Sequence, residues 1–183
     1  MTPHTYPPVI TVDEHDNEIG SAMLSEVWEK GLYHRIASVF IIDEQGKMLL
    51  QHRGPNVKAY PNSWDQAAGG HVDAGQTYES TAITEAAEEL GLHNLVLTTL
   101  GTYRSNHQEG KQIINQFERV FSALIPSDTM LQPEAAELSD LQWFTSVELK
   151  ALIGAQSEKF TPGLLYDLEH YFPDFAPTNK TKR

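Results

Sequence analysis

Residues 70–92 read GHVDAGQTYESTAITEAAEELGL, a glycine-punctuated loop that runs into a stretch with helical spacing. Side chains at positions i, i+3 and i+4 of an α-helix share one face, so Glu85, Glu88 and Glu89 are predicted to lie together. Like charges at this spacing repel one another, and the stretch contains no Lys or Arg to relieve them. Hard divalent cations prefer carboxylate oxygens. The acidic face is therefore a candidate metal site; the alternative is an ordinary solvated face of an acidic protein.

The predicted helix spans residues 77–90. Thr77 is suited to cap its start, and Gly91 is suited to end it in a left-handed conformation. A second stripe at the 3.6-residue period is apolar and consists of Ile83, Ala86, Ala87 and Leu90. We expect the helix to pack through this stripe and to present its glutamates on the other side.

The same segment resembles the signature of the Nudix hydrolases, G-x5-E-x7-R-E-U-x-E-E-x-G-U, in which U is an aliphatic residue. The resemblance runs over 23 positions without a gap. The positions that agree are Gly70, Glu85, Ala86, Glu88, Glu89, Gly91 and Leu92. Two positions depart, since Gln76 stands in place of the first Glu and Thr84 in place of the Arg. The matched loss of one negative and one positive charge suggests that a neutral pair has replaced a salt bridge.

The resemblance continues on both sides of the signature. The residues that carry it are Arg53, Pro61, Trp64 and Gly69 upstream, and Glu137, Leu141, Trp143 and Phe144 downstream. It implies an α/β fold, namely a Nudix-type α/β/α sandwich with a mixed β-sheet and an N-terminal hairpin extension. We expect one domain over 1–173, with a core over about 33–150 and the extension over 1–32. Residues 174–183 are expected to form a flexible tail with little to bury.

The order of the predicted elements suits this fold. In the extension, a hairpin over 9–12 and 19–23 precedes a short helix over 25–30. Further strands are predicted over 36–42, 48–52, 67–72, 95–104, 113–125 and 141–144, with a polar turn over 105–112. Two later helices are predicted over 147–153 and 162–171.

The resemblance also assigns a metal site. Glu85, Glu88 and Glu89, with the main-chain carbonyl of Gly70, are the ligands that it implies for Mg²⁺ or Mn²⁺. Glu88 is implied as a ligand, as the general base, or as both. In the family, the residues at positions 76 and 84 help to orient the carboxylates and to bind metal. Because both are altered here, the groups that hold the ligands in place differ from the family pattern.

The other candidate residues lie outside the signature. Glu137 is the expected second catalytic residue, and Glu134 and Glu118 are further candidates for the base, with solvated acids as the alternative reading. Arg53 is expected to hold phosphate oxygens in a bidentate manner, against the alternative of a surface charge at a strand end. His71 is expected to contact the substrate.

The N-terminal third and the phrase LYHRIASVFIIDEQGKMLLQHR resemble the branch of the family that contains isopentenyl diphosphate isomerases. His34 and His71 fall where the isomerases place two metal-binding histidines. The isomerases also need a cysteine where this chain has Gly69, and two glutamates where it has Ile114 and Gln116. Isomerase activity is therefore disfavoured, and the two histidines are expected to be structural or to contact substrate.

The function that the resemblance implies is metal-dependent hydrolysis of a diphosphate linkage in a nucleoside diphosphate derivative or a similar organic diphosphate. The alternative is a binding or regulatory module whose turnover has been weakened by the residues at positions 76 and 84. A panel of diphosphate substrates separates these readings. Homodimers are common among similar proteins, so a homodimer is one expected state.

Composition limits the partners. The chain has 25 Asp and Glu against 13 Lys and Arg, a net charge of −12, which disfavours a nucleic-acid polymer as partner and leaves a small phosphorylated molecule. It has no cysteine, which excludes a disulfide framework, a thiolate metal site and a cysteine nucleophile. The sequence shows no signal peptide and no apolar run of membrane-spanning length, so a cytoplasmic protein with no membrane partner is expected.

Overall fold

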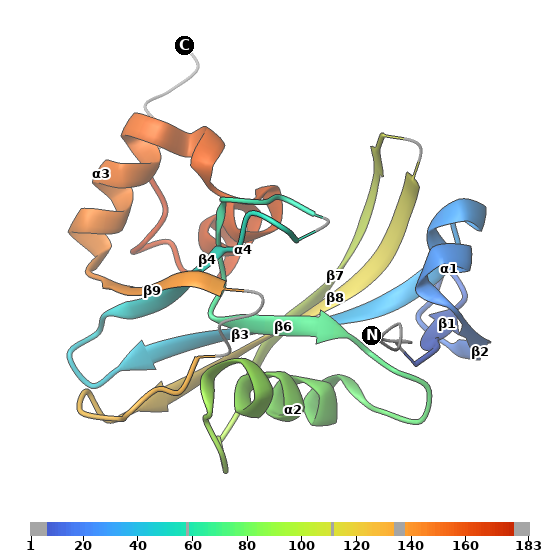
Figure 1. Cartoon of the computed structure of the whole chain (residues 1–183), viewed down its shortest axis with the longest axis horizontal. Helices are drawn as coiled ribbons and strands as arrows, with labels where there is room; N and C mark the ends of the chain where they lie inside the picture. The colour runs from blue at the N-terminus through green and yellow to red at the C-terminus, as the bar shows by residue number, and fades with distance from the viewer. Residues whose placement is uncertain (1–6, 58, 111, 134–137, 178–183) are drawn as a thin grey trace.

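A computed structural model describes residues 7–57, 59–110, 112–133 and 138–177. These residues form one mixed β-sheet with helices on both of its faces (Figure 1). This is the predicted α/β/α sandwich. None of the helices in the described part of the chain has the length and apolar character needed to cross a membrane.

The N-terminal extension forms the predicted hairpin and helix. β1 (Val9–Val12) and β2 (Glu18–Ala22) pair in antiparallel fashion. The short helix α1 (Leu24–Lys30) ends at Gly31, whose φ of 63° is left-handed. Because β1 also pairs with the start of β3 (Tyr33–Asp43), the hairpin continues the main sheet.

β3 is the central strand. Along its whole length it pairs in parallel with β8 (Gln112–Ile125). It also pairs in antiparallel fashion with β1, with β6 (Ala68–His71) and with β4 (Met48–Arg53). The sheet is completed by β5 (Trp64–Asp65) and β9 (Leu138–Phe144), which pair with β4, and by β7 (Thr98–Glu109), which pairs with β8.

The hairpin of β7 and β8 is longer than predicted. The polar turn expected over 105–112 is wrong, because both strands continue through it and their last pair joins Glu109 to Gln112. Gly110, with a φ of 60°, has the left-handed backbone that suits a tight turn. The end of this β7–β8 hairpin, called the arm below, projects from the rest of the sheet (Figure 1). Both faces of the arm therefore tolerate polar side chains.

The helices divide the core in two. α2 (Tyr78–Leu90) covers one face of the sheet, and α3 (Ser146–Gln156) and α4 (Pro162–Tyr171) cover the other (Figure 1). A short 3₁₀ helix, η1 (Ser157–Lys159), joins α3 to α4. The core under α2 includes Ala37, Val39, Ile41, Leu49, Ala82, Ala86, Leu90 and Phe121. The core under α3 and α4 includes Phe40, Met48, Leu50, Val120, Leu149, Leu164 and Leu168.

The predicted buried stripe of α2 is partly wrong. Ala86 and Leu90 are buried as expected, but the stripe is completed by Tyr78, Thr81 and Ala82. Ile83 is 37% exposed, and Ala87 is only half-buried. The small side chains of Ala82 and Ala86 let the helix axis approach the sheet closely, and this contact sets which face is buried.

Two residues of the expected flexible tail belong to the core. Phe175 and Ala176 are buried and belong to the core under α3 and α4. The backbone amide of Phe175 donates to the carbonyl of Phe172 at 2.8 Å, which folds the chain back after α4. The expectation that residues from 174 onward have little to bury is therefore wrong for these two, because the Phe175 ring closes the end of the core.

Candidate metal and diphosphate site

Glu85 lies directly against the main chain of Gly70. α2 packs on β6, and a Cβ atom placed on Gly70 would overlap the Glu85 carboxylate. The φ of Gly70 is not left-handed, so glycine is needed here for space and not for backbone conformation. Gly70 and Glu85 are thus close together, and their role as ligands of one metal ion stays a prediction.

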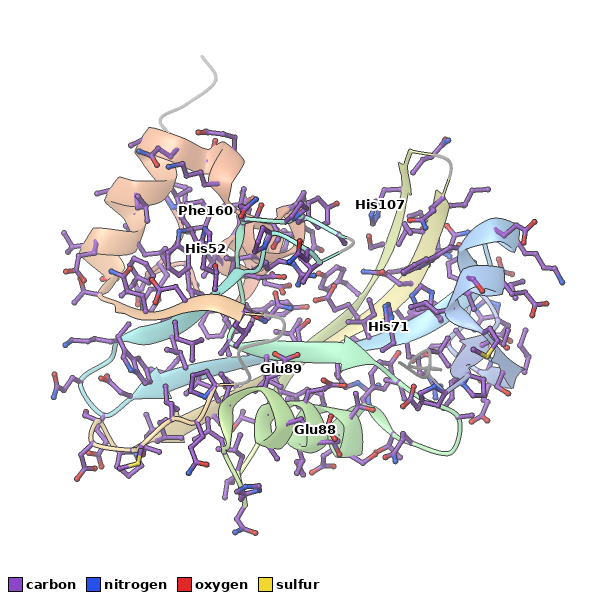
Figure 2. All side chains as sticks on the ribbon, viewed as in Figure 1. His52, His71, Glu88, Glu89, His107 and Phe160 are labelled. Carbon is purple, nitrogen blue, oxygen red and sulfur yellow. The ribbon has the colours of Figure 1, made fainter. Side chains whose placement is uncertain are left out.

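The other two glutamates lie on the same side of the helix. Gln51 of β4 donates from Nε2 to Glu89 Oε2 at 3.4 Å. Glu88 is exposed, and its charge, after the larger effect of burial, raises the pKa of Asp73 in the loop before α2. Figure 2 shows Glu88 and Glu89 on α2, with Glu89 on the side of β6. The acidic face therefore borders β4, β6 and the loop before α2.

Side chains alone do not enclose a metal ion here. Among the residues that the structure describes, no three His, Cys, Asp or Glu side chains are grouped closely enough to hold one. Mg²⁺ is commonly bound by one or two carboxylates, several waters and phosphate oxygens of a substrate. The Glu85 carboxylate against the Gly70 main chain fits such an ion, held from one side by protein and from the other by water and substrate.

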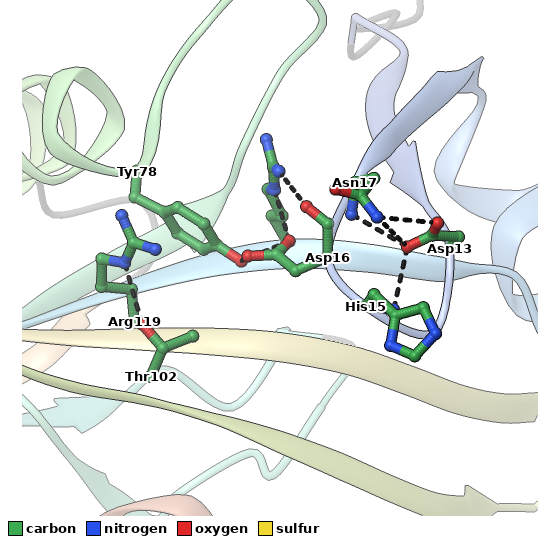
Figure 3. A network of polar contacts seen from close by, with 8 residues as sticks. Asp13, His15, Asp16, Asn17, Tyr78, Thr102 and Arg119 are labelled. Carbon is green, nitrogen blue, oxygen red and sulfur yellow. Dashed lines mark hydrogen bonds and ion pairs between the residues drawn. The ribbon is translucent and has the colours of Figure 1, made fainter.

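The start of α2 is fixed by the N-terminal hairpin (Figure 3). The Tyr78 hydroxyl donates to the carboxylate of Asp16 at 3.0 Å, and Arg35 Nε donates to the same carboxylate at 2.7 Å. The Arg119 guanidinium lies 4.1 Å from the centre of the Tyr78 ring. The extension therefore helps to position the helix that carries the glutamates.

The rings of buried His34 and half-buried His71 lie side by side. Their ring centres are 5.1 Å apart, and the ring of Trp28 lies 6.0 Å from that of His71. Burial lowers the pKa of His34 to about 4, and burial together with the nearby His34 lowers the pKa of His71 to about 3. Both rings are therefore neutral at pH 7. Contact between His71 and a substrate stays a prediction.

Arg53 is held by protein groups. Its Nη1 donates to Asp65 at 3.1 Å and its Nε donates to the carbonyl of Ala59 at 3.0 Å. Thr161 donates to the other oxygen of Asp65 at 2.7 Å. Arg53 therefore anchors the loop after β4 through a partly buried ion pair, and its contact with phosphate stays a prediction.

Glu118 is buried and does not face solvent. It accepts hydrogen bonds from Ser38 and, at 2.7 Å, from the Tyr103 hydroxyl. Asp167 of α4 is fully buried, and its charge and that of Glu118 influence each other. Asp167 was not among the residues predicted for the site. Its place at i, i+3 and i+4 with Leu164 and Leu168 was the signal, because that spacing puts it on the buried face of α4.

Glu134 and Glu137 lie outside the described residues. The assignment of Glu137 as a catalytic residue therefore stays a prediction.

The two residues that depart from the signature line one small pocket. Its volume is about 40 Å³, and it is lined by His71, Asp73, Gln76, Thr81, Thr84 and Glu85. Gln76 Oε1 accepts a hydrogen bond from Ser80 at 2.6 Å, so the start of α2, and not Thr84, orients its amide. Gln76 and Thr84 thus line the same small pocket, and the replacement of a salt bridge by a neutral pair stays a hypothesis.

Comparison with known proteins supports the resemblance. A family model described as the NUDIX domain matches residues 32–164. An isopentenyl-diphosphate Delta-isomerase of Nocardia farcinica is 32% identical over 165 residues, covering 88% of this chain and 93% of that protein. An uncharacterized Nudix hydrolase of Pseudomonas aeruginosa is 36% identical over 160 residues, covering 87% of this chain and 90% of that protein.

Solved structures share the fold. DR0079 from Deinococcus radiodurans superposes with a TM-score of 0.72 at 24% identity, covering 90% of this chain and 99% of that one. The Nudix domain of Shewanella oneidensis NrtR, complexed with ADP ribose, has a TM-score of 0.55 at 18% identity, covering 78% and 85%. Since the family model spans most of the chain and the two curated relatives align over nearly their whole length, the chain belongs to the Nudix family.

Proposed function

We propose that this protein is a divalent-cation-dependent hydrolase that cleaves a diphosphate linkage in a nucleoside diphosphate derivative or a similar small organic diphosphate. The close approach of the Glu85 carboxylate to Gly70 carries this proposal, because it brings together two of the residues that we propose as ligands of the ion. Membership of the Nudix family supports it. The net charge of −12 suits a small substrate held through a local cation better than a nucleic-acid polymer.

The chemical problem is negative charge. A diphosphate repels an attacking water, and the charge on its oxygens and leaving group grows toward the transition state. A bound Mg²⁺ or Mn²⁺ supplies positive charge at the phosphate and lowers the pKa of a water. Glu85, Glu89 and the carbonyl of Gly70 would hold the ion. Glu88, at the exposed rim, is a further ligand or accepts the proton from the water that attacks phosphorus, with Glu137 as the second candidate.

Two other residues are proposed to contact the substrate. Arg53 is kept in place by Asp65 and by the carbonyl of Ala59, so its guanidinium presents a fixed positive charge. His71 is neutral at pH 7 and is proposed to exchange a hydrogen bond with a phosphate oxygen without adding charge.

The names of some relatives raise isomerisation as a second function. The paired rings of His34 and His71 favour it. Position 69 opposes it, because a Cβ atom on Gly69 would lie 2.8 Å from the carbonyl oxygen of Ala37, so a cysteine does not fit there without a backbone shift. Ile114 is buried, and its side chain has no oxygen to offer a metal. Hydrolysis is therefore the function that the site supports best.

The test is a substrate panel of nucleoside diphosphate derivatives and isopentenyl diphosphate, each with Mg²⁺ or Mn²⁺, with products separated by anion-exchange chromatography. We expect cleavage that falls by about 10- to 100-fold or more in Glu89→Gln. Glu79→Gln, which removes the same charge from an exposed position on the same helix, should remain close to wild type.

Other outcomes would assign the other functions. Tight binding of a nucleotide without cleavage across the panel would support a regulatory module. Conversion of isopentenyl to dimethylallyl diphosphate would support an isomerase.

A further inference from the structure

Two arginines on neighbouring strands lie on the face of the sheet that α2 covers. Arg119 of β8 pairs with Thr102 of β7. Arg104 lies two residues further along β7, on the same side of the strand, so the two arginines are diagonal neighbours. Diagonal neighbours lie roughly 7–8 Å apart, a distance that long side chains can span. The Arg119 guanidinium lies 4.1 Å from the centre of the Tyr78 ring of α2, which places it on that face.

These two guanidinium groups lack the counter-charge that two other arginines have. Arg35 and Arg53 each form an ion pair with an aspartate. Among the residues that the structure describes, no carboxylate forms an ion pair with Arg104 or Arg119. An unpaired positive charge attracts anions, and more strongly where it is partly removed from water. Positive charge is therefore in local excess here, in a chain whose net charge is −12.

Arg119 is held in a fixed position. It is half-buried, its Nε donates to Thr102 Oγ1 at 2.9 Å, and its guanidinium lies against the Tyr78 ring (Figure 3). A guanidinium has five N–H donors, and the hydrogen bond to Thr102 uses one of them. Within the described ranges, its two Nη atoms donate to no other residue. These donors are thus ordered before a ligand arrives, which lowers the entropy cost of binding.

We propose that Arg104 and Arg119 bind a phosphate group, at a site separate from the metal site on α2. The planar guanidinium fork matches phosphate oxygens and binds them in a bidentate manner. A phosphate group has enough oxygens and charge for two guanidinium groups, whereas a carboxylate has only two oxygens, which one guanidinium can occupy. The ligand is inorganic phosphate or the phosphate group of a small organic molecule.

The phosphate site lies on different strands from the proposed metal site. The acidic face of α2 borders β4 and β6, whereas the two arginines belong to β7 and β8. Binding through guanidinium groups needs no divalent ion. A bound phosphate would stabilise the folded protein, because the unfolded chain does not hold the two arginines together. The inference therefore stands whether or not the protein hydrolyses a diphosphate.

The first experiment follows binding at Arg119 itself by nuclear magnetic resonance. Wild-type protein labelled with nitrogen-15 is freed of divalent ions with a chelator, so that phosphate cannot bind through a metal. Inorganic phosphate, a nucleoside monophosphate and the matching nucleoside are titrated separately at constant ionic strength. We expect the Arg119 Nε–H signal to shift in a saturable manner with a phosphate-bearing ligand, with a Kd of about 1 mM or lower, and not with the nucleoside.

The three titrations separate the possible ligands. Tighter binding of the monophosphate would identify an organic phosphate as the ligand, and equal or tighter binding of inorganic phosphate would identify the free ion. A lack of saturable shift with both phosphates, or an equal shift with the nucleoside, would overturn the proposal.

The second experiment uses variants. Arg104→Gln removes an exposed charge, so the fold should be kept while the affinity for phosphate falls by about 10-fold. Arg119→Lys keeps the charge but removes the fork, so it should also weaken binding, followed at the backbone amide of Thr102. Lys159→Gln removes an exposed positive charge from η1 and should bind phosphate as wild type does. Unchanged affinity in Arg104→Gln, or an equal loss in Lys159→Gln, would contradict the proposal.

Discussion

Two adjacent glycines, Gly69 and Gly70, show how single residues shape the site. Neither has a left-handed φ, so both are needed for the space that a missing side chain leaves. The space at Gly70 admits the Glu85 carboxylate, and the space at Gly69 admits the carbonyl of Ala37. The signature marks Gly70 in the sequence, but the atom that fills its space comes from a helix fifteen residues later.

Gly70→Ala tests this contact. The added methyl group displaces the Glu85 carboxylate, so we expect turnover to fall by about 10- to 100-fold and the Mg²⁺ concentration for half-maximal rate to rise. The measurement is kcat/KM over a Mg²⁺ titration with the substrate identified in the panel. Gly163→Ala is the control, since a Cβ atom there meets nothing within 4 Å. Unchanged kinetics in Gly70→Ala would show that the contact has no part in metal binding.

At the scale of elements, α2 is defined by its ends. Thr77 and Ser80 form a reciprocal capping box, and Gly91 ends the helix with a φ of 70°. The predicted helix over 77–90 is thus confirmed to within one residue, because caps depend on neighbouring residues alone. Its buried face was less predictable, since the sheet that it contacts and the anchor between Tyr78 and Asp16 come from distant parts of the chain.

A comparison of two caps tests whether α2 supports the site. Thr77→Ala and Thr145→Ala each remove the capping hydroxyl of a helix, from α2 and from α3 respectively. Each should lower stability by about 1 kcal/mol, which corresponds to a fall in Tm of about 2–4 °C. Only Thr77→Ala should weaken Mg²⁺ binding, measured by calorimetry, because α2 alone carries the glutamates. Equal weakening in both variants would contradict a local role for α2.

In the whole molecule, two buried acids from different elements, Glu118 of β8 and Asp167 of α4, influence each other through their charges. Burial and the charge of Glu118 raise the pKa of Asp167 to about 9, and burial raises the pKa of Glu118 as well. In the unfolded chain the pKa of an aspartate is about 4. Between these values the native protein holds a proton that the unfolded chain releases. The contribution of Asp167 to the free energy of unfolding therefore falls as pH rises through this window.

Asp167→Asn should remove this dependence. Asparagine has nearly the same shape and no charge, so we expect the variant to gain about 1–3 kcal/mol relative to wild type at pH 8 and little at pH 4. Urea unfolding at the two pH values measures it. Asp174→Asn, at an exposed position after α4, should follow wild type at both. If the free energy of unfolding changed with pH equally in Asp167→Asn and in wild type, Asp167 would not titrate as described.

Local spacing and the signature were enough to predict most of the strands and helices in their order, the caps of α2, the common face of Glu85, Glu88 and Glu89, and the family. The two-residue strand β5 and the short helix η1 were not predicted. Three predictions were wrong: the turn within the arm of β7 and β8, the buried face of α2, and the lack of burial in the tail. In each case the polarity of the residues was used without knowledge of the elements that pack against them.

The contacts between residues distant in sequence could be known only from the folded chain. It brought Gly70 against Glu85, paired Arg53 with Asp65, placed Glu118 near Asp167, and opened a pocket between the two residues that depart from the signature. The physical reason is that spacing along a helix or strand fixes which side chains share a face. The space and charge that each side chain meets depend on which other elements pack against that face.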